Sequence, residues 1–195
     1  MMDIEMIREK DNKLEFSLKG GPVYFANLIR RYAIGQVPVF AIDRVTFYEN
    51  SSPMFDEYLA HRLGEVPLTS DIGRSTDEIV LTLEASGPGV VYSKALKSTD
   101  SKIKAALDDI PLLKLLEGQN LRLEAKARSG IGREHAKFQA GLISYEVLKP
   151  NELRLKAESF MQIEPRALLA KSADLVIAKC EELEEALADV KKAKE

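Results

Sequence analysis

The stretch PRALLAKSADLVIAKCEELEEALADV, residues 165–190, carries the clearest structural pattern in this chain. Its apolar side chains recur at alternating steps of four and three residues, at Leu169, Ala173, Val176, Cys180, Leu183, Leu187 and Val190. This spacing is typical of the seam along which two helices pack in a coiled-coil-like contact. One helix over these residues is roughly 40 Å long at ~1.5 Å per residue, more than a small α+β core needs. We therefore expect a partner chain on this helix; the alternative is that it packs along its own sheet.

The N-terminal residues predict a hairpin followed by a helix. Apolar and polar side chains roughly alternate over Asp3–Glu9 and over Lys13–Lys19, as they do in strands. A helix is expected over Pro22–Ile34, because proline suits a first helical turn and Gly35 suits a stop. Its apolar stripe consists of residues at helical spacing: Phe25, Leu28, Ile29, Tyr32 and Ala33. Its polar side carries Arg30 and Arg31.

The next segment predicts an internal strand and a second helix. Val37–Tyr48 is rich in β-branched and aromatic residues. Ser52 is then expected as the N-cap of a helix that ends at Gly64. Its expected apolar stripe consists of Phe55, Tyr58, Leu59 and Leu63.

Between about residues 70 and 150 the pattern changes to short β-like runs. Turn signals rich in Gly and Ser or Asn occur at 86–89, 117–120 and 129–132. They separate the runs Ile79–Ala85, Val90–Ala95, Leu112–Leu116, Leu121–Ala127 and Leu142–Leu148. A further strand, Leu153–Phe160, precedes the final helix. These patterns predict an α+β protein with a separate β-rich domain in its middle.

The composition excludes several classes of protein. The chain has 195 residues, one cysteine, two histidines and a formal net charge of −3. One cysteine cannot form a disulfide framework, and together with two histidines it cannot supply four zinc ligands. The slightly acidic balance argues against a stand-alone nucleic-acid binder. With neither a secretory signal pattern nor a run of ~18 apolar residues, we expect a cytoplasmic protein without a membrane span.

Polar residues of the second helix form the first candidate site. Glu57 and His61 are four residues apart, so both could reach one metal ion, but no third ligand is apparent nearby and an ion pair is the ordinary interpretation. Together with Asp56 and Arg62 they indicate a polar docking face. We do not interpret this set as catalytic, because no nucleophile accompanies it.

Two further features have simple structural interpretations. Gly130–His135 begins like a dinucleotide-binding motif but lacks its third glycine, and a loop in which the glycines supply positive φ is the alternative. Cys180 lies on the apolar seam, where a thiol behaves as a small apolar side chain, and we expect no redox or nucleophilic role for it.

Several ordered segments resemble one known family. They are NLIRR at 27–31, VPVFAIDRV at 37–45, NSS at 50–52, DEYLAHRLGEVPL at 56–68, GQNLRLEA at 118–125 and GIGREHAKF at 130–138. Together they are similar to the α-like subunits of multisubunit RNA polymerases, and in particular to the archaeal D subunits. The eukaryotic third-largest subunit is also similar.

The resemblance implies a two-part architecture. A dimerisation domain, in which a sheet is packed by two helices, comprises residues 1–69 and 151–195, and the β-rich domain 70–150 is inserted between them. Family members dimerise through their first and last helices. The implied interface is therefore formed by Phe25, Leu28, Ile29, Tyr32, Leu169, Val176, Cys180, Leu183 and Leu187.

The resemblance also implies partners and a role. The usual archaeal partner is the small subunit L, and the heterodimer, joined by small subunits N and P, is the platform for the two large catalytic subunits. The expected docking residues for a large subunit are Arg30, Arg31, Asp56, Glu57, His61 and Arg62. We expect a non-catalytic assembly scaffold with no catalytic residues, no bound metal, no small-molecule substrate and no membrane contact, because the carboxylate constellation of a polymerase active site is absent.

One departure from the family concerns a cofactor. Many archaeal D subunits carry a ferredoxin-like insertion that binds iron–sulfur clusters, placed where this chain has only Lys149–Glu152. A cluster held by four cysteines cannot form in a chain with one. Either the lineage lacks the insertion or it has been deleted, and the abrupt junction favours deletion. A cluster is expected only if a full-length protein contains the insertion.

Two other functions stay open at this point. One is a small nucleotide-binding enzyme that uses the Gly130–His135 loop, which would be stabilised by ATP or NAD. The other is a generic coiled-coil adaptor, which would self-associate without selectivity for subunit L.

Overall fold

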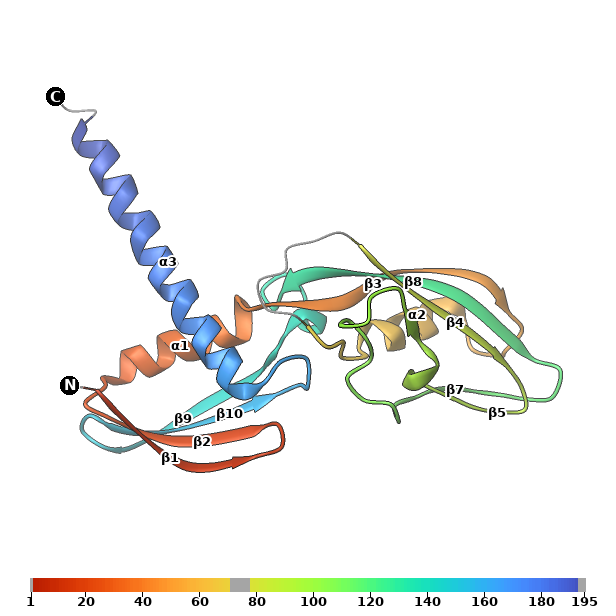
Figure 1. Cartoon of the computed structure of the whole chain (residues 1–195), viewed down its shortest axis with the longest axis horizontal. Coiled ribbons are helices and arrows are strands. Elements are labelled where there is room, and N and C mark those ends of the chain that lie inside the picture. The colour runs from red at the N-terminus through yellow and green to blue at the C-terminus, as the bar shows by residue number, and fades with distance from the viewer. Residues whose placement is uncertain (1, 71–77, 193–195) are drawn as a thin grey trace. The chain divides into compact units, whose positions relative to one another are not determined.

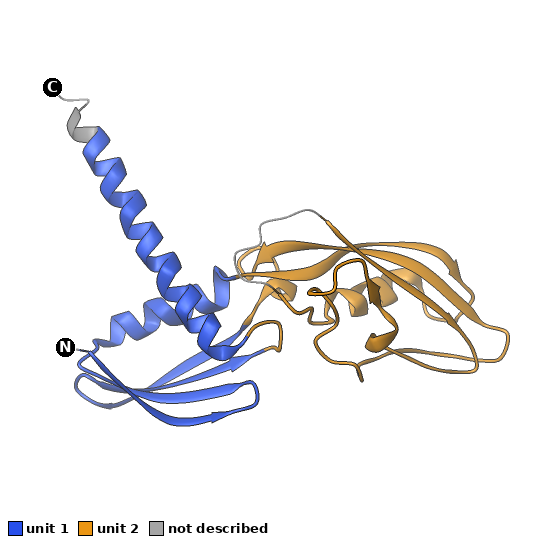
Figure 2. Ribbon diagram, in the orientation of Figure 1, with its two compact units in different colours: residues 1–37, 141–159, 164–195 blue, residues 38–140, 160–163 orange. Residues whose placement is uncertain are grey.

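The computed structural model describes residues 2–70 and 78–192, with side chains placed as far as Asp189. The side chain of Val190, the last seam residue predicted above, therefore lies outside the described part. The chain divides into two compact units (Figure 2). Unit 1 comprises residues 1–37, 141–159 and 164–195, and unit 2 comprises residues 38–140 and 160–163. None of the described helices is long and apolar enough to cross a membrane.

Unit 1 is an antiparallel sheet with two helices (Figure 1). The strand order is β1-β2-β10-β9, with the bounds β1 Asp3–Lys10, β2 Lys13–Lys19, β10 Glu152–Ser159 and β9 Gly141–Lys149. The helices are α1, Val23–Gly35, and α3, Pro165–Lys192. Both the hairpin and the long helix expected from their periodicity are present.

The core of unit 1 lies between one face of this sheet and the two helices. Alternate side chains of a strand point to the same side, so one face of the sheet can be apolar. The buried strand residues are Leu14, Phe16, Leu18, Ile143, Leu153, Leu155 and Ala157. The helices add Ala26, Ile29, Ala33 and Leu168. The opposite face carries cross-strand ion pairs, such as Arg154 with Glu15 at 3.7 Å and with Glu146 at 3.5 Å.

Unit 2 contains a second antiparallel sheet, of order β3-β8-β4-β6. Its strands are β3 Pro38–Asn50, β8 Asn120–Ile131, β4 Ile79–Ser86 and β6 Lys97–Ser98. A two-stranded sheet pairs β5, Gly89–Tyr92, with β7, Pro111–Leu115. The unit also has helix α2, Asp56–Gly64, and the short 3-10 helices η1, Ser93–Ala95, and η2, Ala136–Phe138. The α+β class expected from the sequence is thus confirmed.

The second helix begins later than expected. Ser52 is not its N-cap, because the Asn50 carboxamide oxygen accepts hydrogen bonds from the backbone N–H and the hydroxyl of Ser52, at 3.2 and 2.7 Å. The segment before the helix is therefore held in a turn by Asn50. The N-cap position falls to Phe55, whose side chain makes no capping hydrogen bond.

The boundaries of the two units also differ from the expected division into residues 1–69 plus 151–195 and residues 70–150. β3 belongs to unit 2 because it pairs with β8 along nearly its whole length, and α2 packs with it. β9 belongs to unit 1 because it pairs with β10. Strand pairing between segments far apart in sequence sets both boundaries.

Candidate functional site

The first half of α3 packs inside unit 1, whereas its second half is uncovered. Leu168 is buried, and Leu169 and Val176 are half-buried. Every side chain from residue 177 to residue 189 is exposed, including Leu183 at 60% and Leu187 at 54%. Figure 1 shows this part of the helix extending away from the sheet of unit 1. Burying apolar surface gains ~25 cal/mol per Å², so an uncovered apolar seam of this kind is typical of surfaces that another chain covers.

The predicted interface residues do not all lie on this uncovered surface. On α1, Leu28 is exposed, and Phe25 and Tyr32 are half-buried. Ile29 is buried and faces the core of unit 1, so in the chain alone it is less exposed than the other predicted interface residues of α1. Cys180 is exposed on α3, in line with Leu183 and Leu187. An exposed Tyr24 at 78%, which the sequence did not single out, adds apolar area to α1.

The two arginines of α1 differ in their surroundings. The Arg30 guanidinium donates to the Asn27 carboxamide oxygen through Nε at 3.2 Å and Nη2 at 2.9 Å, and its side chain is half-buried. Arg31 is exposed. Both lie in unit 1, whereas the other expected docking residues lie on α2 in unit 2.

The four polar residues of α2 are exposed, but Arg62 is engaged within the chain. Its Nε donates to the carbonyl of Leu112 at 2.9 Å and its Nη2 donates to the carbonyl of Pro111 at 2.5 Å. The guanidinium therefore fastens α2 to β7. Asp56 accepts a hydrogen bond from the Asn50 carboxamide at 2.7 Å. In the described part of the chain, no group of three or more His, Cys, Asp or Glu residues is arranged to hold a metal ion.

The apolar stripe predicted for this helix is only half correct. Leu59 and Leu63 are fully buried, whereas Phe55 is 70% and Tyr58 is 68% exposed. At 3.6 residues per turn Leu59 and Leu63 share a face, and Tyr58 lies about 100° from Leu59. The angle separates Tyr58 from the buried face, whereas Phe55, four residues before Leu59, differs from it by lying at the N-cap position, before the first turn of the helix.

The Gly130–His135 segment is not a phosphate loop. Gly130 lies in β8, opposite Val39 of β3, and among described residues the glycines with positive φ are Gly20, Gly89 and Gly118. A Cβ at position 130 would stand 2.9 Å from the ring of Phe138, which is fully buried. Glycine is thus required by the close approach of this ring, not by a turn. η2 is only three residues long and offers no helix N-terminus for a phosphate.

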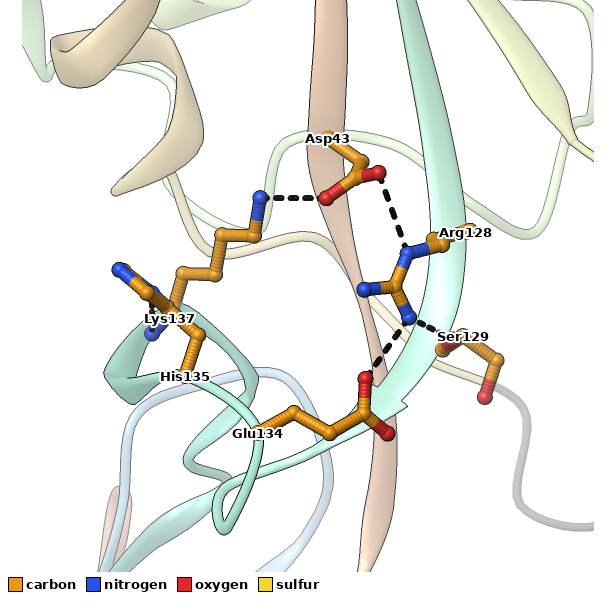
Figure 3. A network of polar contacts seen from close by, with 6 residues as sticks. All are labelled: Asp43, Arg128, Ser129, Glu134, His135 and Lys137. Carbon is orange, nitrogen blue, oxygen red and sulfur yellow. Dashed lines mark hydrogen bonds and ion pairs between the residues drawn. The ribbon is translucent and has the colours of Figure 1, made fainter.

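Ion pairs connect the segment after β8 to the sheet of unit 2 (Figure 3). Asp43 on β3 accepts from Lys137 Nζ at 2.7 Å and pairs with Arg128 Nε at 3.2 Å. Arg128 Nη1 reaches Glu134 at 3.0 Å. The Arg128 guanidinium also lies 4.6 Å from the centre of the Phe138 ring. The hydrogen bond from Lys137 is the main cause that lowers the pKa of the Asp43 carboxyl. Partial burial opposes this change, and the hydrogen bond from Arg128 also lowers the pKa.

We expect the variant Asp43→Asn to be about 1 kcal/mol less stable than wild type at pH 7. The pKa of Asp43 is lower in the folded chain than in the unfolded chain. Its contribution is therefore fully present above about pH 4 and is lost as the pH falls through the folded value. Urea unfolding at pH 7 and pH 3 measures this difference. Glu84→Gln, at an exposed position of the same sheet, is the control, and a penalty that persists unchanged at pH 3 would contradict the assignment.

Comparison with known proteins shows the family to which this chain is similar. Residues 45–148 match the RNA polymerase Rpb3/RpoA insert domain. Among similar curated proteins is DNA-directed RNA polymerase subunit Rpo3 of Pyrococcus horikoshii, 40% identical over 190 residues that cover 93% of this chain and 72% of the relative. Rpo3 of Methanocaldococcus jannaschii is 42% identical over 166 residues, 85% of each chain. The chain belongs to the archaeal Rpo3 family of RNA polymerase subunits.

Rpo3 proteins vary in length. The chain spans 59% of Rpo3 of Pyrococcus furiosus, to which it is 44% identical over 153 residues, or 74% of this chain. The equal coverage with the Methanocaldococcus jannaschii protein makes those two chains similar in length. The insert-domain match begins within β3 and ends within β9, so it contains most of unit 2.

Proposed function

We propose that this Rpo3-family chain is a non-catalytic scaffold of DNA-directed RNA polymerase that pairs with the small subunit L. The observation that carries the proposal is the second half of α3, whose apolar side chains are exposed over residues 177–189. The seam spacing read from the sequence continues along this face through Cys180, Leu183 and Leu187. A partner helix would bury this surface and supply the contact that the chain itself lacks.

The heterodimer is proposed as the platform on which small subunits N and P and the large catalytic subunits assemble in the cytoplasm. Arg31, Glu57 and His61 are exposed and available for docking. Arg62 is a weaker candidate, because its guanidinium is used inside unit 2. Nucleotide addition is assigned to the large subunits, and this chain to their arrangement.

We propose that the chain binds no cofactor of its own. The place where an iron–sulfur domain would enter is a closed hairpin, in which Lys149 of β9 stands opposite Glu152 of β10. Asn151 in the turn has φ of 61°, a conformation that asparagine tolerates. The residues do not fit a cluster, since the single cysteine lies on α3. The similar length of the Methanocaldococcus jannaschii relative favours a lineage without the insertion over a deletion.

Co-expression with subunit L of the same organism tests the proposal. We expect the two chains to elute together as a 1:1 complex in size-exclusion chromatography, with a higher melting temperature than this chain alone, because a partner that binds only the folded state stabilises it. A well-folded monomer that does not co-elute with subunit L would refute the proposal. Self-association without selectivity for subunit L would favour the adaptor function.

A further inference from the structure

Two aromatic side chains stand exposed at the start of α2. Phe55 and Tyr58 are 70% and 68% exposed, and their ring centroids lie 6.3 Å apart. The helix does not need them for its own packing, because Leu59 and Leu63 are fully buried and Met54 packs against the same core. Adjacent large aromatic side chains that do not pack in the hydrophobic core are typical anchor residues of protein interfaces.

The backbone beneath these rings is held rigidly. The Asn50 carboxamide donates to the carbonyl of Met54 at 2.9 Å and to the Asp56 carboxylate at 2.7 Å. At the other end of the helix, Arg62 donates to the carbonyls of Pro111 and Leu112. The backbone that carries the aromatic pair is therefore held in place, so that binding a partner orders only the two side chains.

The surroundings of the pair specify the chemistry of a partner. A hollow of about 520 Å³ beside Tyr58 is lined by Pro53, Met54, Tyr58, His61 and Arg62. Glu57, between the two aromatic residues in sequence, is exposed and has no ion-pair partner in the described part of the chain. The positive charge of Arg62 is directed toward backbone carbonyls. Exposed rings next to a free carboxylate attract cationic side chains that also offer apolar area.

We propose that Phe55, Glu57 and Tyr58 form a docking patch for a basic and partly apolar surface on another polymerase subunit. This inference rests on the scaffold function proposed above and adds to it both the aromatic anchors and the charge of the partner. A lysine or arginine of the partner stacks on the Tyr58 ring and pairs with Glu57. Apolar side chains of the partner fill the hollow beside Met54.

The test uses the heterodimer with subunit L, titrated with each remaining polymerase subunit of the same organism by fluorescence anisotropy. We expect Tyr58→Ala and Glu57→Lys each to weaken the binding of one and the same subunit by about tenfold or more. Tyr48→Ala, at another exposed aromatic position of unit 2, is the matched control and leaves that affinity within about twofold. Wild-type binding falls with added salt, and Glu57→Gln reduces this salt dependence.

The outcomes separate this inference from the proposed function. Unchanged affinity in all α2 variants, with wild-type binding intact, overturns the docking patch and leaves the scaffold function standing. A wild-type heterodimer that binds none of the subunits overturns the scaffold function, and the docking patch with it. Melting temperatures equal to wild type show that the variants are folded, as expected for side chains two-thirds exposed.

Discussion

Replacing Leu183 by aspartate is expected to abolish pairing with subunit L while leaving the isolated chain as stable as wild type. Leu183 is 60% exposed in the chain alone, so the carboxylate remains in water there. In the complex it would lie on the buried seam without a partner charge. Such a charge costs about 3 kcal/mol or more, roughly a hundredfold in Kd.

Analytical ultracentrifugation of the mixture with subunit L measures this loss. The matched control is Ala178→Asp, which introduces the same charge on the opposite side of α3 at an exposed position. Leu183 is a sharper probe than Val176, because Val176 is half-buried within unit 1 and its replacement also disturbs the fold. Pairing of Leu183→Asp with wild-type affinity would show that the partner does not use this seam.

The second large effect is expected at Phe138. Its ring is fully buried, lies against Gly130 of β8, and is approached by Arg128 and Lys137 at 4.6 and 5.2 Å from its centre. Truncation to alanine removes this packing and leaves a cavity under the ion pairs of Asp43. The free energy of unfolding is expected to fall by about 3–5 kcal/mol.

Urea unfolding followed by circular dichroism measures the change at Phe138. Gly130→Ala approaches the same contact from the other side and is expected to cost about 1–3 kcal/mol, because the added methyl meets the ring at 2.9 Å. Leu116→Ala, at a 55% exposed position, is the control and is expected to stay within about 0.5 kcal/mol. A loss below about 1 kcal/mol for Phe138→Ala would contradict the packing described here.

The elements that a local pattern specifies were predictable from the sequence. The strands of the N-terminal hairpin follow from alternation, and α3 follows from a spacing repeated over three heptads. Both patterns show which side of a strand or helix is apolar, and they can be read from residues that are close together in the sequence. The function was predicted from the family resemblance, because hydrophobic periodicity predicts secondary structure and does not predict function.

Features that depend on distant partners were not predictable in the same way. β8 runs through to Ile131 because β3 pairs with it there, although its last residues resemble a turn in sequence. The local sequence around Gly130 suggested a positive φ, which the residue does not adopt; glycine is needed there because the Phe138 ring lies against it. Phe55 and Tyr58 were predicted to belong to the apolar stripe of the second helix, whereas both side chains are exposed in the structure.

The turn between β9 and β10 is a position at which this fold can accept inserted residues. Its two connecting residues, Pro150 and Asn151, join strands whose pairing fixes the ends of any longer segment close together. Added length there leaves the sheet register unchanged, and each doubling of a flexible loop costs only about 0.6 kcal/mol in closure entropy. A whole folded domain whose termini are adjacent can therefore enter at this position. The same turn is a suitable place for a fluorescent reporter that must leave both units and the α3 seam intact.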